Sequence, residues 1–468
     1  MSAETQSQPK VIGYLPDDTP PIGAMLSLGF QQFLTMFPAT VLVAALTKFD
    51  VGMTLLASGL GTIVALLVAK RKIPMYYGSS FSYIAVIITV MSKFAPTCFN
   101  DPNQFYCADG VRIAQVGILL TAVFEILVGL LIMRIGKSAL DKVLPPIITG
   151  SMAMVIGVAL AGAALNNASG ISVKAGPDLA WKFWVVALIT LLATILFSVY
   201  LRGKGLIGML PILLGAVFGY LVAIPFGLVH FDTVIAAHWL ALPKWTFPAF
   251  TDPSAWGMAL SVALIFIATV PESTAHLYQM SLYIDTLAGE LGREPSGIKN
   301  LIGLNLVADG SDDVVNGLLG GCAGTNYGEN NSLMAITRNY STAVLMTAGI
   351  MAIVLGFFGK LVAVVNTLPV AVQGGLSIYL FGVIGMQGVA LIQSEKVNLF
   401  DPKQLAVGAV ILICGIGGNL ALPNGLFPFQ IPYLFPSGIP AIVFAAILGI
   451  LVNLIFLIFK APVVSEVE

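Results

Sequence analysis

The sequence predicts an all-α, polytopic membrane protein of about fourteen transmembrane segments, arranged as an inverted repeat of seven and seven. Three observations lead to this fold class. Of the 468 residues, 57% are hydrophobic and only 10% are charged, whereas soluble domains carry roughly a quarter charged residues. Apolar runs of about 20 residues, long enough to cross a bilayer, recur along the chain. Two pairs of short motifs also repeat between the halves at one constant offset.

Most of the predicted spans are uninterrupted apolar runs, which lie at 24–46, 51–69, 113–133, 144–166, 180–201, 206–228, 255–279, 343–365, 368–392, 403–420 and 437–459. Three further segments are shorter or broken by polar residues, at 73–92, 301–322 and 325–341. The polar segment 280–300 is interpreted as a solvated cytoplasmic loop or surface helix.

The orientation follows from the distribution of Lys and Arg between the spans. With a cytoplasmic N-terminus, 15 of these residues fall on the cytoplasmic side and 7 on the other. Because cytoplasmic loops are enriched in Lys and Arg, we expect a plasma-membrane protein with both termini in the cytoplasm. Cys98 and Cys107 then share an external loop, where they either form a disulfide or stay free, since sequence alone does not fix pairing.

Two motif pairs indicate the inverted repeat. Met75–Ser82 and Thr325–Ser332 both carry Tyr-Gly followed by polar residues, in the third and tenth spans. Leu144–Gly150 and Leu368–Gly374 share a Leu-Pro start and a later Gly, in the fifth and twelfth spans. Both offsets are seven spans, so the halves insert with opposite orientations. Inverted repeats with Gly-interrupted spans are typical of transporters that bind their cargo near the bilayer midplane.

Glu272 and His276 are ionisable residues inside an apolar span. Charged groups at membrane depth are costly and usually functional, and the i, i+4 spacing places both on one helical face. A carboxylate beside an imidazole can share or pass a proton. The alternative is a structural polar contact near the helix end.

Glu329 follows Tyr327–Gly328 in the interrupted tenth span. Non-helical backbone at membrane depth must line protein or a cavity, and the half-helix that begins there offers free N–H groups and a positive dipole end. Gly328 allows a ligand to approach the backbone. Further polar groups follow, which bind ligand or simply cap the helix: Asn330, Asn331, Ser332 and Thr337.

Other polar residues within spans have weaker interpretations. Asp309 could brace the site, whereas Asp312 and Asp313 would mark the end of the ninth span. Gln32 could donate to a ligand or pair with a neighbouring helix. Glu125 lies alone in the fourth span, where packing is as good an explanation as function.

These groups suit a small planar ligand with N–H donors and carbonyl acceptors. Ionised carboxylates only accept hydrogen bonds, and Phe81 and Tyr327 offer aromatic faces for stacking. The sequence contains no nucleophile–base constellation, metal cluster or nucleotide-binding motif, so we expect neither an enzyme nor a bound cofactor or metal. A net charge of −1 gives no electrostatic footprint for nucleic acid.

The stretch Tyr327–Arg338 resembles the signature of the nucleobase–ascorbate transporter family, in which Gln-Asn or Glu-Asn is followed at fixed spacing by Thr. Its Glu form is similar to bacterial uracil permeases, and the Gln form is more typical of xanthine and urate carriers. Pro271–His276, Gly78–Phe81 and Met36–Thr40 also match, in the same order. Gln32, Pro38 and Asn331–Ser332 depart from the usual pattern, the last directly beside the site.

The resemblance implies a core domain of spans 1–4 and 8–11 and a gate domain of spans 5–7 and 12–14. It also implies short antiparallel strands in spans 3 and 10 that meet at the substrate, and a homodimer. The corresponding boundaries are 1–23 for the N-terminal segment, 24–134 and 255–342 for the core (the last span extending to about 365), and 135–230 and 366–460 for the gate.

The resemblance also implies residue roles. Glu272 and Glu329 would bind the base, and His276 would tune Glu272 and couple the proton. The pocket would be lined by Phe81, Ala39, Tyr327, Gly328 and Ser80, and supported by Asn330, Thr337, Asp309 and Gln32. The expected function is proton-coupled import of a nucleobase, uracil first, by alternating access. The alternatives are a xanthine or urate permease of the same family and an anion exchanger or channel on the same fold, although two carboxylates repel an anion.

Overall fold

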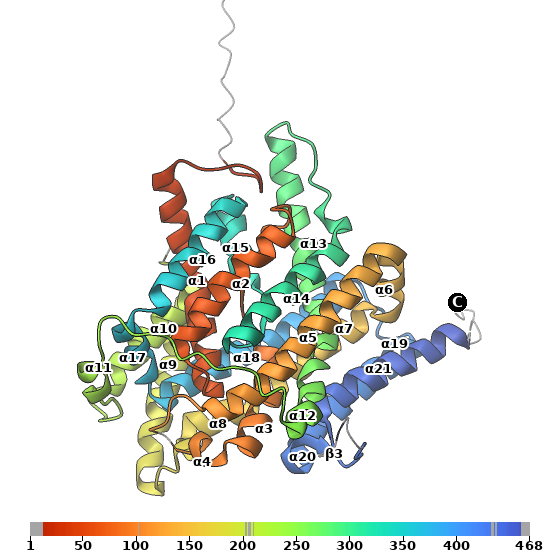
Figure 1. Ribbon diagram of the computed structural model, residues 1–468. Helices are drawn as coiled ribbons and strands as arrows, with labels where there is room; N and C mark the ends of the chain where they lie inside the picture. Colours follow the sequence, from red (N-terminus) through yellow and green to blue (C-terminus); the bar gives the residue numbers. More distant parts are fainter. Residues whose placement is uncertain are drawn as a thin grey trace, which may run out of the picture.

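The computed structural model describes residues 13–101, 103–201, 204, 207–208, 210–431, 435 and 438–459 (Figure 1). The expected N-terminal segment 1–23 is therefore described only from residue 13. Three basic residues used for the orientation lie outside the described residues: Lys10, Arg202 and Lys460.

The first half of the described chain forms seven helical segments in the expected order. They are α1 (Ile22–Thr47), α2 (Val51–Val68), β1 (Tyr77–Ser79) with α3 (Ile84–Phe94), α5 (Ala108–Ile135), α7 and α8 (Pro146–Ala159, Ala161–Ser169), α9 (Pro177–Tyr200) and α10 (Pro211–Ala223). Short helices join them: α4 (Pro96–Phe99), α6 (Lys137–Val143) and α11 (Asp232–Ala236).

The second half repeats this pattern. Its segments are α12 and α13 (Pro253–Ala263, Phe266–Glu290), α14 (Ile302–Leu319), β2 (Gly324–Asn326) with α15 (Gly328–Thr337), α16 (Thr342–Gly356), α18 (Val370–Ser394), α19 and α20 (Pro402–Leu412, Gly418–Ala421) and α21 (Ala441–Ile458). A second strand pair joins β3 (Leu426–Phe427) to β4 (Ile439–Pro440). The predicted fold class, a helical membrane protein with short strands in the interrupted spans 3 and 10, is confirmed.

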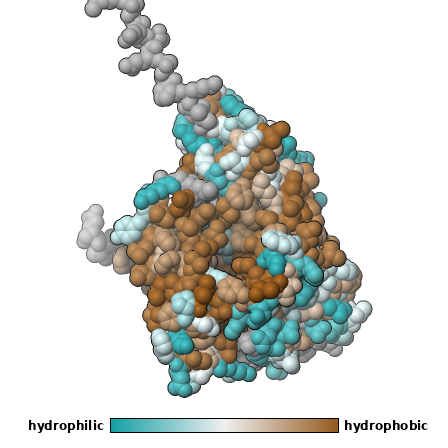
Figure 2. Space-filling view, turned by 90° about the vertical axis from the view of Figure 1, so that its left-hand side faces the viewer, coloured by the Kyte–Doolittle hydropathy of each residue, from teal (hydrophilic) through white to brown (hydrophobic). Residues whose placement is uncertain are grey.

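The helices have the length and apolarity that a bilayer requires. Within the described residues, eight helices are long and apolar enough to cross a membrane, and shorter apolar helices cover Phe81–Phe94, Pro211–Ala223 and Thr342–Gly356. Figure 2 shows hydrophobic side chains in a broad band over one face, with hydrophilic side chains gathered toward the ends. Such a surface is stable in lipid and would aggregate in water.

Two predicted boundaries were wrong. The eighth span continues as α13 to Glu290 and ends just before Gly292, where the backbone turns left-handed (φ 66°). The segment 280–300, expected as a loop or surface helix, therefore begins as a continuation of this helix. The eleventh span stops at Gly356, and α17 (Gly359–Asn366) follows separately. The break arises because Phe357 and Gly359 exchange backbone hydrogen bonds with residues 239–241 instead of continuing the helix.

The long helices pack in two groups. In one, α2, α5, α12, α14 and α16 pack against one another, and α1 lies on α2 and α16. In the other, α18 packs against α7, α8, α9 and α10, and α19 packs against α7 and α21.

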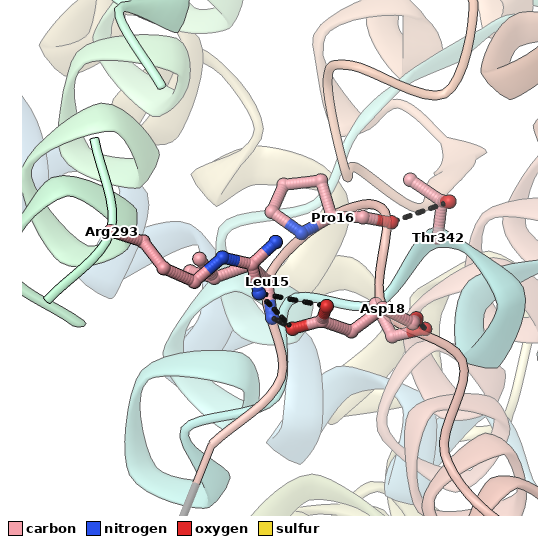
Figure 3. A network of polar contacts seen from close by, with 6 residues as sticks. Leu15, Pro16, Asp18, Arg293 and Thr342 are labelled. Carbon is pink, nitrogen blue, oxygen red and sulfur yellow. Dashed lines mark hydrogen bonds and ion pairs between the residues drawn. The ribbon is translucent and has the colours of Figure 1, made fainter. Parts of the chain in front are cut away.

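The first described residues contact the start of α16 and the segment just beyond α13 (Figure 3). The Thr342 hydroxyl donates to the Pro16 carbonyl oxygen at 2.9 Å, at the start of α16. The Arg293 guanidinium donates to both carboxylate oxygens of Asp18 at 2.8 Å, just beyond α13. This segment therefore ties the two helices together on the side where α15 also ends.

Cys98 and Cys107 are joined by a disulfide. The closed loop is anchored to the α1–α2 connection, because the Cys107 N–H donates to the Lys48 carbonyl oxygen at 3.0 Å and the Lys48 ammonium donates to the Gln104 carbonyl oxygen at 2.6 Å. The bridge thus fastens the segment between α3 and α5 to the bundle.

We expect a Cys98→Ser variant to lose about 2–3 kcal/mol of unfolding free energy, the value for closing a loop of this length in the unfolded chain. Thermal unfolding with and without reductant measures the effect. Cys414→Ser, which removes a free cysteine, is the control and should leave the transition unchanged. A wild-type transition that does not respond to reductant would contradict the prediction.

Candidate functional site

Strands β1 and β2 cross at the centre of the first helix group. They pair antiparallel, with Tyr77 opposite Asn326 and Ser79 opposite Gly324. Helix α2 satisfies the outer edge of β1: the Ser58 hydroxyl donates to the Tyr77 carbonyl oxygen at 2.7 Å, and the Tyr77 N–H donates to Thr62 Oγ1 at 3.0 Å. Backbone groups at membrane depth need such hydrogen-bond partners. The short strands are therefore stable only where the surrounding helices supply them.

Tyr327 locks the strands on the side facing α1. Its hydroxyl donates to the Ser79 carbonyl oxygen at 2.8 Å and lies 3.1 Å from Thr40 Oγ1. A Cβ atom at Gly78 would lie 2.6 Å from the Tyr327 ring, so only glycine leaves room for it. The ring is 4% exposed. Its aromatic face therefore packs against β1, and the side chain holds the strands in register.

We expect Tyr327→Phe to reduce the unfolding free energy by about 1–3 kcal/mol, since the buried Ser79 carbonyl oxygen and Thr40 hydroxyl each lose a partner. The ring itself is kept, so packing against Gly78 is unchanged. Thermal unfolding of the purified protein measures the loss, and Tyr200→Phe, at an exposed tyrosine, is the matched control. Equal transitions for both variants would show that the hydroxyl does not hold the strands.

His276 is held at the end of β2. Its Nδ1 lies 2.6 Å from Asn326 Oδ1 and 3.1 Å from the Asn326 carbonyl oxygen, while the Asn326 amide donates to Ser273 Oγ at 2.6 Å. With two oxygens as partners, Nδ1 is assigned the proton. In the neutral ring Nε2 is then an acceptor. It lies beside Gly328, since a Cβ atom added to this glycine would be only 2.8 Å from Nε2.

Glu272 and Glu329 converge beside His276. Glu272, one helical turn before His276, is half-buried and lies within electrostatic range of His276, Glu329 and the Ser82 hydroxyl. Glu329 occupies the first turn of α15 and is exposed. A carboxylate is favoured at this positive helix end. The two acids and the imidazole thus form one polar group next to the strands.

One face of α15 is open. Glu329, Ser332 and Ile336 are exposed and follow one another along this helix. Because a carboxylate is not placed in lipid without compensation, this face borders a space that water can enter. The stripe runs from the site toward the end of α15, where the N-terminal segment lies.

The expected supporting residues are only partly brought together. Asn330 joins α15 to α1, because its amide donates to the Gln32 carbonyl oxygen at 2.9 Å and to Gln32 Oε1 at 2.7 Å. Asp309 Oδ2 lies 3.4 Å from the Asn326 amide. The Thr337 hydroxyl instead donates to the Leu333 carbonyl oxygen of its own helix at 2.8 Å, at the far end of α15, where it has no part in this cluster.

The expected lining residues differ in position. The Phe81 ring meets Phe381 of α18 edge-on, with centroids 6.0 Å apart and planes at 75°, so it touches the second helix group. The Ser80 N–H donates to the Ala323 carbonyl oxygen at 2.8 Å and so prolongs the strand pairing. Ala39 is buried in α1.

Three residues of this arrangement lie within motifs quoted from the sequence but were given no role there: Ser82, Ser273 and Asn326. Asn326 directly precedes Tyr327, which was a signal that could have been used. Ser82 and Ser273 are small hydroxyl residues in helical segments, where they are too common to attract notice.

Residues 23–423 match the family model of the xanthine and uracil permeases, a permease family. The chain belongs to the nucleobase–ascorbate transporter family. The resemblance found in the Tyr327–Arg338 signature is thereby confirmed, and this family member is a permease rather than an enzyme.

Several relatives of this family member are similar over most of its length. It is 35% identical over 442 residues to the uracil permease of Bacillus caldolyticus, covering 94% of this chain and 93% of the relative. The uracil permease of Escherichia coli K12 is 33% identical over 401 residues, covering 86% of each.

Solved structures show the same fold for this family member at low identity. The transmembrane domain of a cyanobacterium bicarbonate transporter, BicA, superposes with a TM-score of 0.58 at 18% identity, covering 87% of this chain and 98% of that one. The murine Slc26a9 anion transporter in the inward-facing state superposes with a TM-score of 0.58 at 14% identity, covering 98% and 73%. The chain is a multi-pass membrane protein.

Proposed function

We propose that this permease is a proton-coupled symporter that imports a nucleobase, and that the nucleobase is uracil. The observation that carries the proposal is the convergence of Glu272, Glu329 and His276 beside two broken spans. The relatives named uracil permeases, similar over 86–94% of this chain, support the choice of ligand.

The donors and acceptors of uracil complement this site. Each ring N–H of uracil requires an acceptor, and Glu272 and Glu329 are acceptors when ionised. Each carbonyl oxygen requires a donor. Tyr327, at the N-cap of α15, makes no capping side-chain hydrogen bond, so the first N–H groups of the helix are available to a ligand carbonyl.

Proton coupling would use the same group of residues. Protonation of Glu272 or His276 changes the charge of the site, and His276 is hydrogen-bonded to Asn326 at the end of β2. Proton binding and ligand binding are then linked through groups in direct contact. No bound cofactor is required, and the proton is the coupling ion.

Alternating access would move a core (24–134 and 255–342) against a gate (135–230 and 366–460). The separate packing of the two helix groups supports this division, and Phe81 with Phe381 lies between them. With cytoplasmic termini in the plasma membrane, the open face of α15 points toward the cytoplasm. We include a homodimer in the proposal, in keeping with the resemblance.

The test is uptake of labelled uracil into proteoliposomes with and without an inward proton gradient, in competition with xanthine, urate and thymine. We expect uptake that the gradient stimulates and that unlabelled uracil, but not xanthine, abolishes. Purine uptake instead would assign the protein to the xanthine or urate carriers of the family. Uptake of an anion such as bicarbonate, with none of any base, would overturn the nucleobase proposal.

A further inference from the structure

Four carboxyl groups lie buried together behind the paired strands. Glu125 comes from α5, and Asp309, Asp312 and Asp313 come from α14; their exposed fractions are 2%, 5%, 0% and 0%. Helices α5 and α14 touch here, since a Cβ atom at Gly310 would lie 3.2 Å from the Glu125 Cβ. We call these four side chains the carboxyl cluster. Glu125, which the sequence analysis placed alone in the fourth span, thus lies beside three aspartates of the ninth span.

Asp312 and Asp313 fasten the cluster to β2. The Asp312 carboxylate fits between the backbone of α2 at Gly61 and the backbone of β2 at Gly324. A Cβ atom added at Gly61 would lie 1.9 Å from Asp312 Oδ1, and one added at Gly324 would lie 1.8 Å from Asp312 Oδ2. Asp313 Oδ1 accepts the Gly324 N–H at 2.6 Å. The cluster thus lies directly behind the strand that leads to Asn326 and His276.

The charges that act on the cluster are negative. Glu125 lies within electrostatic range of all three aspartates, and Asp309 also within range of Glu272. Burying an ionised carboxylate without a partner is very unfavourable, and the mutual repulsion of four adds to this cost. Some of the four charges must therefore be neutralised.

Several atoms at the cluster have no hydrogen-bond partner within the part of the chain that the structure describes. They are Asp309 Oδ1, Asp312 Oδ1, Asp313 Oδ2 and the Tyr77 hydroxyl. Tyr77 is fully buried, and it lies within electrostatic range of Asp309, Asp312 and Glu125. Buried polar groups are normally satisfied, so these carboxylate oxygens favour a bound group that donates to them and neutralises charge.

A proton fits this role better than a metal ion. Nowhere among the described residues do three or more acidic, His or Cys side chains come close enough to hold a metal. A protonated carboxyl group gains an O–H donor, which supplies what the unpartnered acceptors lack.

We propose that the carboxyl cluster of Glu125, Asp309, Asp312 and Asp313 is a proton-binding site, separate from the ligand-facing pair Glu272 and Glu329. Asp309 links it to that pair, since its Oδ2 lies 3.4 Å from the Asn326 amide whose oxygen contacts His276. Protons bound to the cluster would move together with the core domain when that domain moves against the gate. Its contribution to coupling rests on the proposed function, whereas the binding of protons does not.

Other titratable groups face the cluster. Tyr77 and Tyr76 come from the β1 segment, Tyr83 from the turn after it, and Glu272 from α13. The tyrosines are neutral at physiological pH, and Glu272 adds negative charge on ionising. Ionisation of Glu272 would therefore strengthen proton binding at Asp309.

Infrared difference spectroscopy of the purified protein tests the proposal directly. We expect wild type at neutral pH to show a carboxylic-acid carbonyl band that shifts in D2O. Glu125→Gln and Asp312→Asn, which keep shape but cannot be protonated, should each reduce this band. Glu272→Gln reports the contribution of the ligand-facing pair, and Glu395→Gln, at an exposed glutamate, should leave the band unchanged.

Two results would overturn the proposal. The first is a wild-type spectrum without the band, or a band that neither cluster variant reduces while both variants remain monodisperse. The second is a band that disappears when sodium is added, which would assign the cluster to a metal cation. These measurements need no uracil, so a failed uptake experiment with an intact band would reject the proposed cargo and leave the proton site standing.

Discussion

Replacing Glu329 by glutamine is expected to weaken uracil binding about 10- to 100-fold. A hydrogen bond to a charged group contributes about 1.5–3 kcal/mol, and each 1.4 kcal/mol changes affinity tenfold. Glutamine keeps the size of the side chain but can present an N–H where the ring N–H requires an acceptor. Since Glu329 is exposed at the start of α15, the change should not disturb the fold.

Binding of labelled uracil to purified protein gives the affinity, and thermal unfolding verifies that the variant is intact. Glu395→Gln makes the same substitution at an exposed position after α18 and should bind like wild type. Wild-type affinity in Glu329→Gln would remove this residue from the site and, with it, the main support for a carboxylate-lined pocket.

The second large effect concerns Gly61→Ala. The new methyl group would lie 1.9 Å from Asp312 Oδ1, and the Asp312 carboxylate cannot retreat because its other oxygen already contacts Gly324. Overpacking a filled core costs about 1–3 kcal/mol and occasionally more, and here the displaced group is a buried carboxylate. We expect a strong loss of thermal stability and of strand pairing, and therefore of transport.

Gly162→Ala is the matched control, because it is also a glycine within a helix but has nothing within 4 Å of the added Cβ. The same substitution there should stabilise the helix by about 0.5–1 kcal/mol. Fluorescence-detected size exclusion with a temperature series compares the two. A Gly61→Ala protein as stable as wild type would show that α2 and α14 can separate at this point.

Much of the fold could be predicted because lipid imposes a simple pattern. Runs of apolar residues identified the spans. The repeated Tyr-Gly motif located both broken spans, which do contain β1 and β2. The boundaries at Glu290 and Gly356 were missed for a physical reason. The end of α13 at Glu290 lies in a polar segment, where apolar length gives no signal. The end of α16 at Gly356 depends on backbone hydrogen bonds to residues 239–241, which are distant in sequence.

The candidate site was predictable where a residue is unusual by itself. Charged side chains in apolar spans pointed to Glu272 and Glu329, and the structure places them together. Partnerships across the fold were not predictable. Nothing in the sequence indicates that His276 would contact Asn326, or that Glu125 would meet three aspartates from a span in the other half of the chain.

The pairing of β1 with β2 constrains how the protein is made. Ser79 and Tyr327, which close the strand pair, are 248 residues apart in sequence. Contacts at such separation form late, and the ribosome delivers the second strand long after the first. During synthesis the membrane therefore holds an incomplete third span whose backbone groups await their partners. A factor that shields this span until the tenth arrives would protect the nascent chain from degradation.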